Sequence, residues 1–368
     1  MRKGLAALCG AAVVWAATAR DSPRKKLIEF GWDEPSAAFM KGHIEEMEKT
    51  PFDGCVYHVD FKSEKGESSF AWQTFGKRAF SESELQGSID ALRTTRFTSF
   101  RSNLLRFNAT PGDVDWYDDF SAITTNARLA ARVAKLGRSA GILFDTEPYE
   151  GPLWDYTRQK NPGKRSFADY SAQARRRGRE VMEAFEQGYP GLTVFLTFGH
   201  SYVRWQIPRY QKPHAEVTFG LLAPFIDGMI EGAREAQIVD GHERSYWFKD
   251  AAMFREASAL MREGVRPIVH DFERYKRVMS FGFGIWMDYD WRHEGWEVAD
   301  FKKNYFEPEE FYASVRTAFE LADEYVWVYT EQPRWWSPEG GPVKLPAAYH
   351  DALRRAKRDG AGPVRRPR

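Results

Sequence analysis

Short runs of apolar, β-prone residues recur along the chain at fairly even intervals. Each run is continuous rather than alternating, which is typical of strands that are buried on both faces of a parallel sheet. Eight runs are predicted to be strands: Lys26–Trp32, Gly54–Asp60, Ser102–Asn108, Ala140–Asp145, Leu192–Phe198, Ala236–Gly241, Gly282–Asp288 and Tyr325–Glu331.

Amphipathic segments lie between these runs. In the segment 167–187, apolar residues such as Tyr170, Ala174 and Val181 fall at helical spacing, while four arginines occupy the other face. Such arginines are typical of a solvated helix face rather than a binding patch. The predicted helices are Ala37–Glu48, Glu84–Arg93, Ile123–Leu136, Phe167–Gln187, Ala251–Arg262 and Pro308–Asp323.

Eight strands that alternate with helices predict an α/β fold, a (β/α)8 TIM barrel. The main alternative is a doubly wound open sheet, which would need a glycine-rich phosphate turn after an early strand, and "EFGWDEP" is not one. Without internal repeats or a Pro/Ser-rich linker, we expect a single domain over residues 20–353. The tail of residues 354–368, "RRAKRDGAGPVRRPR", is basic and punctuated by Gly and Pro, and we expect it to be disordered.

The first 19 residues have the features of a secretory signal peptide. Arg2 and Lys3 form a charged start, residues 4–16 form an apolar stretch, and "ATA" ending at Ala19 is a small-x-small cleavage site. The alternative of a membrane anchor is weaker, because the apolar stretch is shorter than the roughly 20 residues that span a bilayer. We therefore expect a secreted or periplasmic protein. Its mature chain would keep Cys55 alone, and one thiol forms no internal disulfide.

Composition narrows the classes of partner. The 53 Lys and Arg nearly balance the 52 Asp and Glu, so no basic surface argues for nucleic acid. No other segment is apolar enough for stable membrane insertion. Aromatic residues make up 15 % of the chain and include 13 Trp, an unusually rich supply. The composition predicts neither the oligomeric state nor any cofactor.

Polar and ionisable residues follow nearly every predicted strand. The carboxyl ends of barrel strands meet at one face, where the active sites of this fold lie. We therefore expect these side chains to surround one shared hollow. In chain order they are Trp32, Asp33, His58, Asp60, Arg106, Asn108, Asp145, Glu147, His200, Asp240, His242, Glu243, Asp288, Asp290, Glu331, Trp335 and Trp336.

The stretch "GILFDTEPYEG" at residues 141–151 places Asp145 and Glu147 directly behind a strand. Two residues apart in extended backbone, these side chains share a face, and two close carboxylates raise one pKa. A raised pKa suits a general acid at neutral pH. The alternative is a carboxylate pair that binds local arginines or caps the next helix.

Aromatic residues near the predicted strand ends suggest a sugar ligand, because the flat C–H faces of sugars stack on aromatic rings. The alternative, core packing, is the usual place of such residues. We expect core packing for Trp286, which lies inside an apolar run. Trp335 and Trp336, between Pro333 and Pro338, are harder to bury and are expected to be a ligand platform.

The chain resembles the barrel-fold glycoside hydrolases from about Leu27 to about Asp351. "GILFDTEPY" is similar to the strand-four signature of chitinase-like hydrolases, D-x-x-D-x-D-x-E, in which Asp145 and Glu147 match the last two acids. Ala140 and Leu143 replace the first two. A galactosidase-type pattern would pair Asp145 with Asp240. The two-glutamate pattern has Asn-Glu on strand four, where this chain has Thr146 before Glu147.

This resemblance implies a glycosidase that acts on an oligo- or polysaccharide. Glu147 is the expected general acid/base, Asp145 orients it or acts as nucleophile, and the other expected catalytic residues are Glu331 and Asp240, with Asp288 a further possible nucleophile. The expected substrate-binding residues are Trp32, Asp33, His58, Arg106, His200, Glu243, Asp288, Trp335 and Trp336. We expect no metal ion or cofactor.

Two alternatives stay open at this point. One is a divalent-metal barrel enzyme whose ligands would be Asp145, Glu147, His200, Asp240, His242 and Glu243. The chain lacks H-E-x-x-H or any tight His pair that would strengthen this alternative. The other is a carbohydrate-binding barrel without catalysis, in which the acids only accept hydrogen bonds from sugar hydroxyls.

Overall fold

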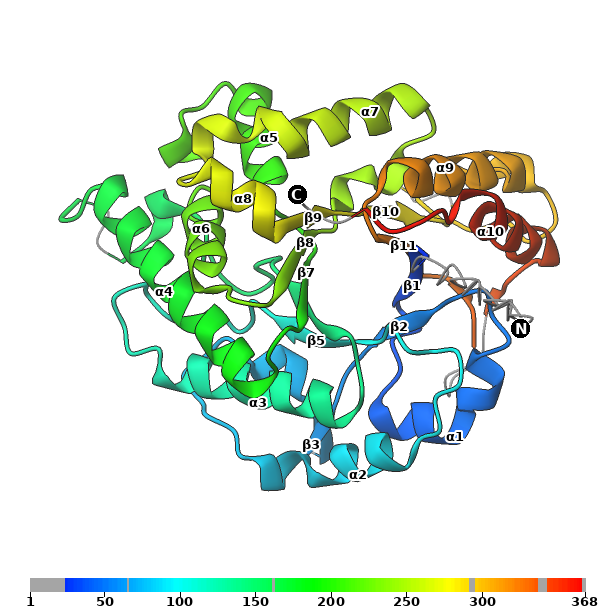
Figure 1. Ribbon diagram of the computed structural model, residues 1–368, viewed down its shortest axis with the longest axis horizontal. Coiled ribbons are helices and arrows are strands. Elements are labelled where there is room, and N and C mark those ends of the chain that lie inside the picture. Colours follow the sequence, from blue (N-terminus) through cyan, green and yellow to red (C-terminus); the bar gives the residue numbers. More distant parts are fainter. Residues whose placement is uncertain (1–23, 65, 161–162, 291–294, 337–342, 366–368) are drawn as a thin grey trace, which may run out of the picture.

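The chain folds into a closed parallel barrel, seen end-on in the computed structural model of Figure 1. The structure describes residues 24–64, 66–160, 163–290, 295–336 and 343–365. The barrel strands are β1 (Lys26–Gly31), β2 (Gly54–Tyr57), β5 (Leu104–Asn108), β6 (Gly141–Asp145), β7 (Thr193–Leu196), β8 (Gln237–Asp240), β9 (Met279–Phe281), β10 (Phe283–Trp286) and β11 (Tyr325–Thr330).

The barrel closes through one interrupted strand. Only Gly282 separates β9 from β10, so the two are halves of a single seventh strand. The first half pairs in parallel with β8, and the second half pairs in parallel with β11. The predicted (β/α)8 barrel is therefore confirmed, and the doubly wound alternative, which requires an open sheet, is wrong.

Helices surround the barrel on its outer side (Figure 1). The six predicted helices are confirmed to within a few residues at their ends, except that the predicted helix Ala251–Arg262 continues past Ala259 as a π-helical turn, Leu260–Gly264. The helices of the described residues are α1 (Ala37–Met47), α2 (Gln86–Thr94), α3 (Ser121–Leu136), α4 (Phe167–Gly188), α5 (His200–Tyr210), α6 (Leu222–Gly232), α7 (Ala251–Ala259), α8 (Phe272–Val278), α9 (Pro308–Leu321) and α10 (Ala347–Gly360).

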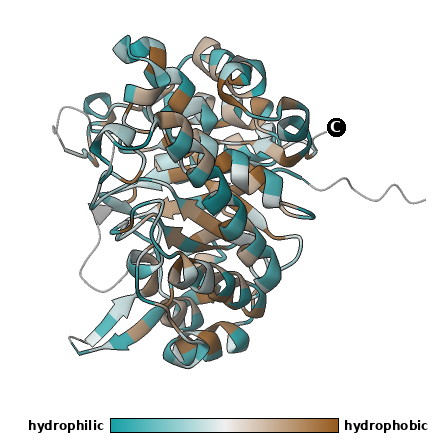
Figure 2. Cartoon of the chain, turned by 90° about the vertical axis from the view of Figure 1, so that its left-hand side faces the viewer, coloured by the Kyte–Doolittle hydropathy of each residue, from teal (hydrophilic) through white to brown (hydrophobic). Residues whose placement is uncertain are grey.

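Two packed layers hold this architecture together. Side chains alternate along each strand, so Ile28 points into the barrel while Leu27 packs against the helices. The inner layer includes Leu143, Phe195 and Trp327. The outer layer is far larger and joins strands to helices. Figure 2 shows the apolar residues concentrated on the central strands and on helix faces turned toward them.

An unpredicted β-hairpin follows the second barrel strand. It consists of β3 (Asp60–Ser63) and β4 (Gly66–Ser69), which pair antiparallel. The short 3-10 helix Phe70–Gln73 comes next, with Phe70 fully buried and Trp72 partly exposed. The hairpin thus carries Ser69 and Trp72 back to the mouth of the barrel, where both line a cavity.

The carboxyl-terminal segment differs from the expectation. Residues 354–360 complete α10, whose Tyr349, Leu353 and Ala356 are fully buried. Beyond the helix, the backbone N–H of Arg365 donates to the carbonyl of Asp323, and Lys25 N–H donates to Gly362. The prediction of disorder is therefore wrong for residues 354–365, because an apolar helix face lies within a segment of mostly charged residues.

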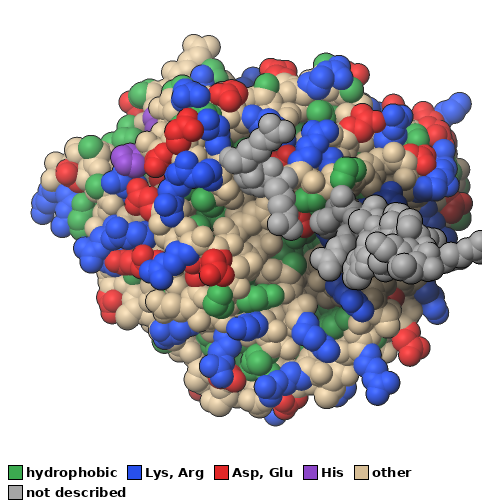
Figure 3. Space-filling view, in the orientation of Figure 1, with side chains coloured by type: hydrophobic (Ala, Val, Ile, Leu, Met, Phe, Trp, Pro, Cys, Tyr) green, Lys and Arg blue, Asp and Glu red, His purple; other side chains and the backbone are tan. Residues whose placement is uncertain are grey.

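The predicted signal peptide and the predicted domain start at residue 20 lie outside the described residues. Within the described part of the chain, no helix combines the length and apolar character needed to cross a bilayer. Cys55 is a buried free thiol in β2. On the face shown in Figure 3, cationic and anionic side chains are interspersed, as the balanced composition predicts.

Candidate functional site

A cavity of about 700 Å³ opens at the carboxyl ends of the barrel strands. This is the end of the fold at which strand-end loops can bring polar side chains together. It combines carboxylates, cations and aromatic rings. The lining residues are Phe30, Gly31, Trp32, Glu34, His58, Ser69, Trp72, Arg106, Asp145, Glu147, Tyr149, Glu243, Tyr246, Trp286, Tyr329, Glu331 and Arg334.

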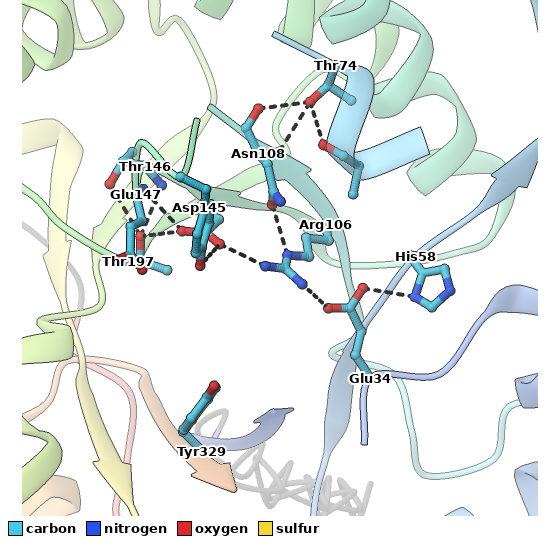
Figure 4. Close-up of polar contacts among 12 residues, drawn as sticks. Glu34, His58, Thr74, Arg106, Asn108, Asp145, Thr146, Glu147, Thr197 and Tyr329 are labelled. Atoms are coloured by element: carbon cyan, nitrogen blue, oxygen red, sulfur yellow. Dashed lines mark hydrogen bonds and ion pairs between the residues drawn. The ribbon is translucent and has the colours of Figure 1, made fainter. Parts of the chain in front are cut away.

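A chain of buried ion pairs runs along one wall of this cavity (Figure 4). Arg106, on the inward face of β5, contacts Glu34 through Nη1 at 2.6 Å and Asp145 through Nη2 at 2.9 Å. Its Nε donates to Oδ1 of Asn108 at 2.8 Å. The two carboxylates raise the pKa of Arg106 despite its burial. Arg106 therefore fixes the relative positions of two acids from different strands.

His58 extends this network at its other end. Its Nδ1 lies 2.9 Å from Oε1 of Glu34, and its Nε2 lies 3.6 Å from Oδ1 of Asp60. Burial opposes charge on the imidazole, but the hydrogen bond and charge of Glu34 outweigh it and raise the pKa of His58. In Glu34, burial is likewise outweighed by Arg106 and His58, so its pKa is lowered. Glu34 and Asp145 thus share Arg106, and Glu34 and Asp60 flank His58.

Asp145 is the most constrained acid of the site. It is 1 % exposed and accepts hydrogen bonds from Tyr149 OH at 3.0 Å and Thr197 Oγ1 at 3.2 Å, in addition to Arg106. The backbone N–H of Glu147 donates to its Oδ1 at 3.2 Å. With four donors around it, Asp145 is suited to orienting its neighbours and supplying fixed negative charge.

Glu147 lies on the cavity wall beside this anchored carboxylate. Burial raises its pKa, and the negative charge of Asp145 raises it further. The carboxyl group therefore keeps its proton to a higher pH than an ordinary glutamate does. The sequence prediction that the two acids of D-x-E interact and shift one pKa is supported by this arrangement.

Glu331 and Glu243 bring two more carboxyl groups to the cavity. Glu331 follows the inward-facing series Tyr325, Trp327 and Tyr329 of β11, and Tyr329 OH donates to it at 3.3 Å. Burial and then the charge of Asp288 raise the pKa of Glu331. Burial, followed by the charges of Asp145 and Glu147, raises the pKa of Glu243 well above its usual range.

A tight turn aims Glu243 at the cavity. Gly241 follows β8 at a point where a Cβ atom would lie 2.3 Å from Phe195 Cε1, so only glycine fits. His242 then adopts a left-handed conformation, with φ of 46°. Ser245 Oγ anchors the turn by donating to the carbonyls of His242 and Gly284. The chain leaves the strand sharply, and the 3-10 turn Glu243–Trp247 begins at the cavity.

Aromatic rings line the cavity in two groups. At the rim, Trp32 is 62 % exposed, and Trp72 meets Tyr149 edge-on with 5.2 Å between ring centroids. Deeper in the cavity, Tyr246, Trp286 and Tyr329 contact one another. Trp286 packs against the inner core of the barrel, as predicted, and its inward position in β10 also makes it line the cavity.

Several predicted site residues lie elsewhere. Asp240 is fully buried on the outward face of β8, where it accepts from Ser201 Oγ at 2.7 Å. Strand alternation explains this, because Val239 takes the inward position. His200 is buried in α5 and bonds Asp227 at 3.0 Å. The expectation that Asp240 and His200 face the shared hollow is therefore wrong.

The predicted ligand platform of Trp335 and Trp336 is also wrong. Both indoles are at most 8 % exposed, and both pack edge-on against Phe52. Their backbone N–H groups donate to the carboxylate of Asp33, which is buried and whose pKa burial raises to about 7. Asp33 therefore holds a loop rather than a ligand.

Asp288 has a similar structural role. It accepts the backbone N–H groups of Glu331 and Gln332, and the indole N–H of Trp286. It is 4 % exposed and does not line the cavity. Asp288 thus positions two cavity residues, Glu331 and Trp286, without reaching a substrate itself.

Sequence reasoning missed some residues of the cavity. Glu34 and Arg334 lie next to residues that were singled out, and Tyr329 was hidden within a predicted strand. Alternation would have found Tyr329, since Tyr325 and Trp327 face inward in the same strand. No sequence signal marked Trp72, because the hairpin that carries it has no apolar pattern.

The residues that were considered as ligands of a divalent metal ion do not lie together in one site. Asp240, His200 and His242 do not line the cavity. Within residues 24–64, 66–160, 163–290, 295–336 and 343–365, no group of three or more His, Cys, Asp or Glu side chains is arranged to hold a metal ion.

The chain matches no protein-family model and no curated protein. Among solved structures it is similar to a beta-mannanase from the blue mussel Mytilus edulis, at 9 % identity and a TM-score of 0.46 over 95 % of this chain and 99 % of that one. It is similar to an endocellulase from Pyrococcus horikoshii, at 12 % identity and a TM-score of 0.44 over 90 % and 91 %. The catalytic core of a xylanase A matches at 9 % identity and a TM-score of 0.33 over 76 % and 95 %. At these values the likenesses assign no substrate to this chain.

Proposed function

We propose that this protein is a glycoside hydrolase that cleaves O-glycosidic bonds of an oligo- or polysaccharide. One observation carries the proposal: Glu147, whose pKa is raised, shares a cavity with the carboxyl group of Glu331 and with exposed aromatic rings. Hydrolysis of a glycoside needs one carboxyl group that gives a proton and a second that is anionic.

Glu147 is the proposed general acid/base. It donates a proton to the leaving glycosidic oxygen as the bond to the anomeric carbon breaks. Burial raises the pKa of Glu147, which favours the protonated form that the step needs, and the charge of Asp145 strengthens this effect. Asp145 holds the Glu147 backbone through a hydrogen bond and is itself fixed by Arg106, so it is a positioning residue.

Glu331 is the proposed second carboxylate. Of the other nucleophiles predicted from sequence, Asp240 lies outside the cavity and Asp288 has its oxygens engaged by N–H groups. Glu331 either attacks the anomeric carbon or removes a proton from the attacking water, and the separation of the two carboxyl groups selects the route. Tyr329 OH, 3.3 Å away, orients it.

The rim aromatics supply the sugar-binding surface. Trp32 is more than half exposed and Tyr149 is 48 % exposed, although both line the cavity. Covering an exposed ring of this kind with the apolar face of a sugar ring costs little free energy. His58 and Arg106 line the same cavity and add polar groups to it.

The test is a hydrolysis screen with a matched pair of variants. Wild-type protein is incubated with a panel of oligosaccharides and polysaccharides, and products are read by mass spectrometry. Glu147→Gln keeps the shape of the side chain but removes its proton, so turnover should be lost while the melting temperature is kept. Glu45→Gln, an exposed change on α1, should leave turnover unaltered.

Two outcomes of this screen would reject the proposal. Tight glycan binding without any product would identify a carbohydrate-binding barrel instead. Undiminished turnover by Glu147→Gln would remove Glu147 from the chemistry.

We also propose that the protein is exported, with cleavage near Ala19. Amino-terminal sequencing of protein recovered outside the cytoplasm tests this, and an intact Met1 there would contradict it.

A further inference from the structure

The two sides of the cavity differ in how their acids are neutralised. On the side formed by β1, β2, β5 and β6, Glu34 and Asp145 share the guanidinium of Arg106, and Glu34 also contacts His58. On the side formed by β8, β10 and β11, the carboxyl groups are Glu243 and Glu331. Figure 4 shows Tyr329, from this second side, across the opening from Asp145 and Arg106.

Glu243 has no cation of its own among the described residues. Arg106 directs its three hydrogen bonds to Glu34, Asp145 and Asn108. Arg244, the next residue, stacks on the rings of Trp205 and Trp247 at 3.7 and 5.5 Å.

Arg334 also lines the cavity, but its guanidinium contacts groups other than Glu243. It donates to the carbonyl of Glu331, lies 3.6 Å from Asp33, and stands over the Trp32 ring. Among the residues that the structure describes, the second side therefore has a carboxyl group without an ion-pair partner.

Three aromatic rings line the same cavity as this carboxyl group. Glu243 and Tyr246 are three residues apart in one 3-10 turn, where side chains at this spacing eclipse, so they lie on the same face. Tyr246 stacks on Tyr329 at 5.2 Å with an angle of 24°, and Trp286 meets the two tyrosines at 5.7 and 5.4 Å. All three rings line the cavity. We call this set, Glu243 with Tyr246, Trp286 and Tyr329, the acidic cage.

We propose that the acidic cage binds the ammonium group of a sugar, so that the substrate contains an unacetylated amino-sugar unit. This inference rests on the proposed function, because it names the substrate class of the same site. Ring faces attract a cation through their quadrupole, and a carboxylate in a poorly hydrated cage adds an ion pair. An N-acetylated unit lacks the positive charge, and a uronic acid would be repelled by Glu243 and Glu331.

Glu243 is a surplus acid in the proposed hydrolysis, which uses Glu147 and Glu331. A neutral sugar would leave the half-buried Glu243 without a counter-ion, which favours its protonated form. An ammonium group would instead stabilise the anion. The charge of the bound sugar therefore decides whether this carboxyl group contributes to binding.

The experiment separates binding from turnover. Isothermal titration with Glu147→Gln protein, chosen to prevent hydrolysis, compares the tetrasaccharides of glucosamine, N-acetylglucosamine and glucose at a mildly acidic pH. We expect the glucosamine tetrasaccharide to bind at least about tenfold more tightly than the two neutral ones, equal to about 1.4 kcal/mol. Added salt should reduce the difference.

A second substitution assigns the preference to the cage. Adding Glu243→Gln should bring the three affinities together, and adding Trp286→Leu should lower the preference by removing one ring. Circular dichroism checks that each variant is folded. If Glu243→Gln does not fold, Trp286→Leu still tests the inference. Equal binding of the three tetrasaccharides, or a preference that survives both substitutions, would overturn the inference.

Wild-type turnover tells this inference apart from the proposed function. If the wild type hydrolyses neutral glycans and titration shows no amine preference, the cage inference alone is wrong. If the glucosamine tetrasaccharide binds preferentially and no glycoside of any kind is cleaved, the hydrolase proposal is wrong and the ammonium site stands.

Discussion

The backbone N–H of Glu147 donates a hydrogen bond of 3.2 Å to Oδ1 of Asp145. The two acids are therefore joined in one turn, and the charge of Asp145 raises the pKa of Glu147, second only to burial. Asp145→Asn would remove that charge and leave Arg106 less compensated, and both changes lower the pKa of Glu147. The alkaline limb of the kcat/KM profile, where the acid loses its proton, should move to lower pH. An alkaline limb that stays in place would show that Glu147 is not the group that titrates.

The His58–Glu34 pair should make stability depend on pH in two directions. The pKa of His58 is raised from 6.5, so its contribution is full below pH 6.5 and is lost as pH rises through the folded-state value. The pKa of Glu34 is lowered from 4.5, so its contribution is full above pH 4.5 and is lost as pH falls. His58→Gln should therefore cost the most stability between these values. Urea unfolding across pH measures this, and a pH-independent cost would contradict the ion pair.

Arg106 should be far more important for stability than a surface arginine. Its contacts with Glu34 and Asp145 are buried, with side chains 12 % exposed or less. Arg106→Met would leave Asp145 without a cation and Glu34 with His58 alone, and we expect the free energy of unfolding to fall by about 3–5 kcal/mol. Arg132→Met, which breaks an exposed pair with Glu82, should cost less than about 1 kcal/mol. Equal costs in chemical denaturation would contradict the structure.

Two tryptophans of the strand-end loops should respond in opposite ways. Trp336→Ala would empty a buried site beside Phe52 and lower the free energy of unfolding by about 3–5 kcal/mol. Trp32→Ala, at an exposed position on the cavity rim, should change stability by about 0.5 kcal/mol or less and weaken glycan binding. Thermal melts and titration of the same glycan separate the two effects. Weaker binding with unchanged stability for Trp336→Ala would restore it as a ligand platform.

The strands and the barrel could be predicted from the sequence, because continuous apolar runs reflect burial on both faces. It was harder to predict whether each side chain at a strand end points into the barrel or toward the helices. Asp145 and Asp240 both end apolar strands, yet alternation turns the first inward and the second outward. Asp145 is two residues after the inward-facing Leu143 and so also faces inward, whereas Asp240 is one residue after the inward-facing Val239 and so faces outward. The position of a residue just after a strand therefore predicts the direction of its side chain less well than its place in the alternation of the strand.

Other features depend on contacts between distant segments. Trp335 and Trp336 are buried because Asp33, three hundred residues earlier, accepts their N–H groups. Trp72 reaches the cavity on a hairpin of polar residues, and α6 is buried on nearly all sides, so it lacks an amphipathic pattern. No local pattern encodes such relationships.

The most direct test of the account is how the loss of Glu147 depends on the leaving group. Glu147→Ala should slow cleavage of a natural oligosaccharide by about 10²–10⁴-fold, because its leaving alcohol needs a proton. The same variant should keep nearly the wild-type kcat/KM for the matching dinitrophenyl glycoside, since that leaving group departs without protonation. Equal losses for the two substrates would contradict the assignment of Glu147 as the general acid.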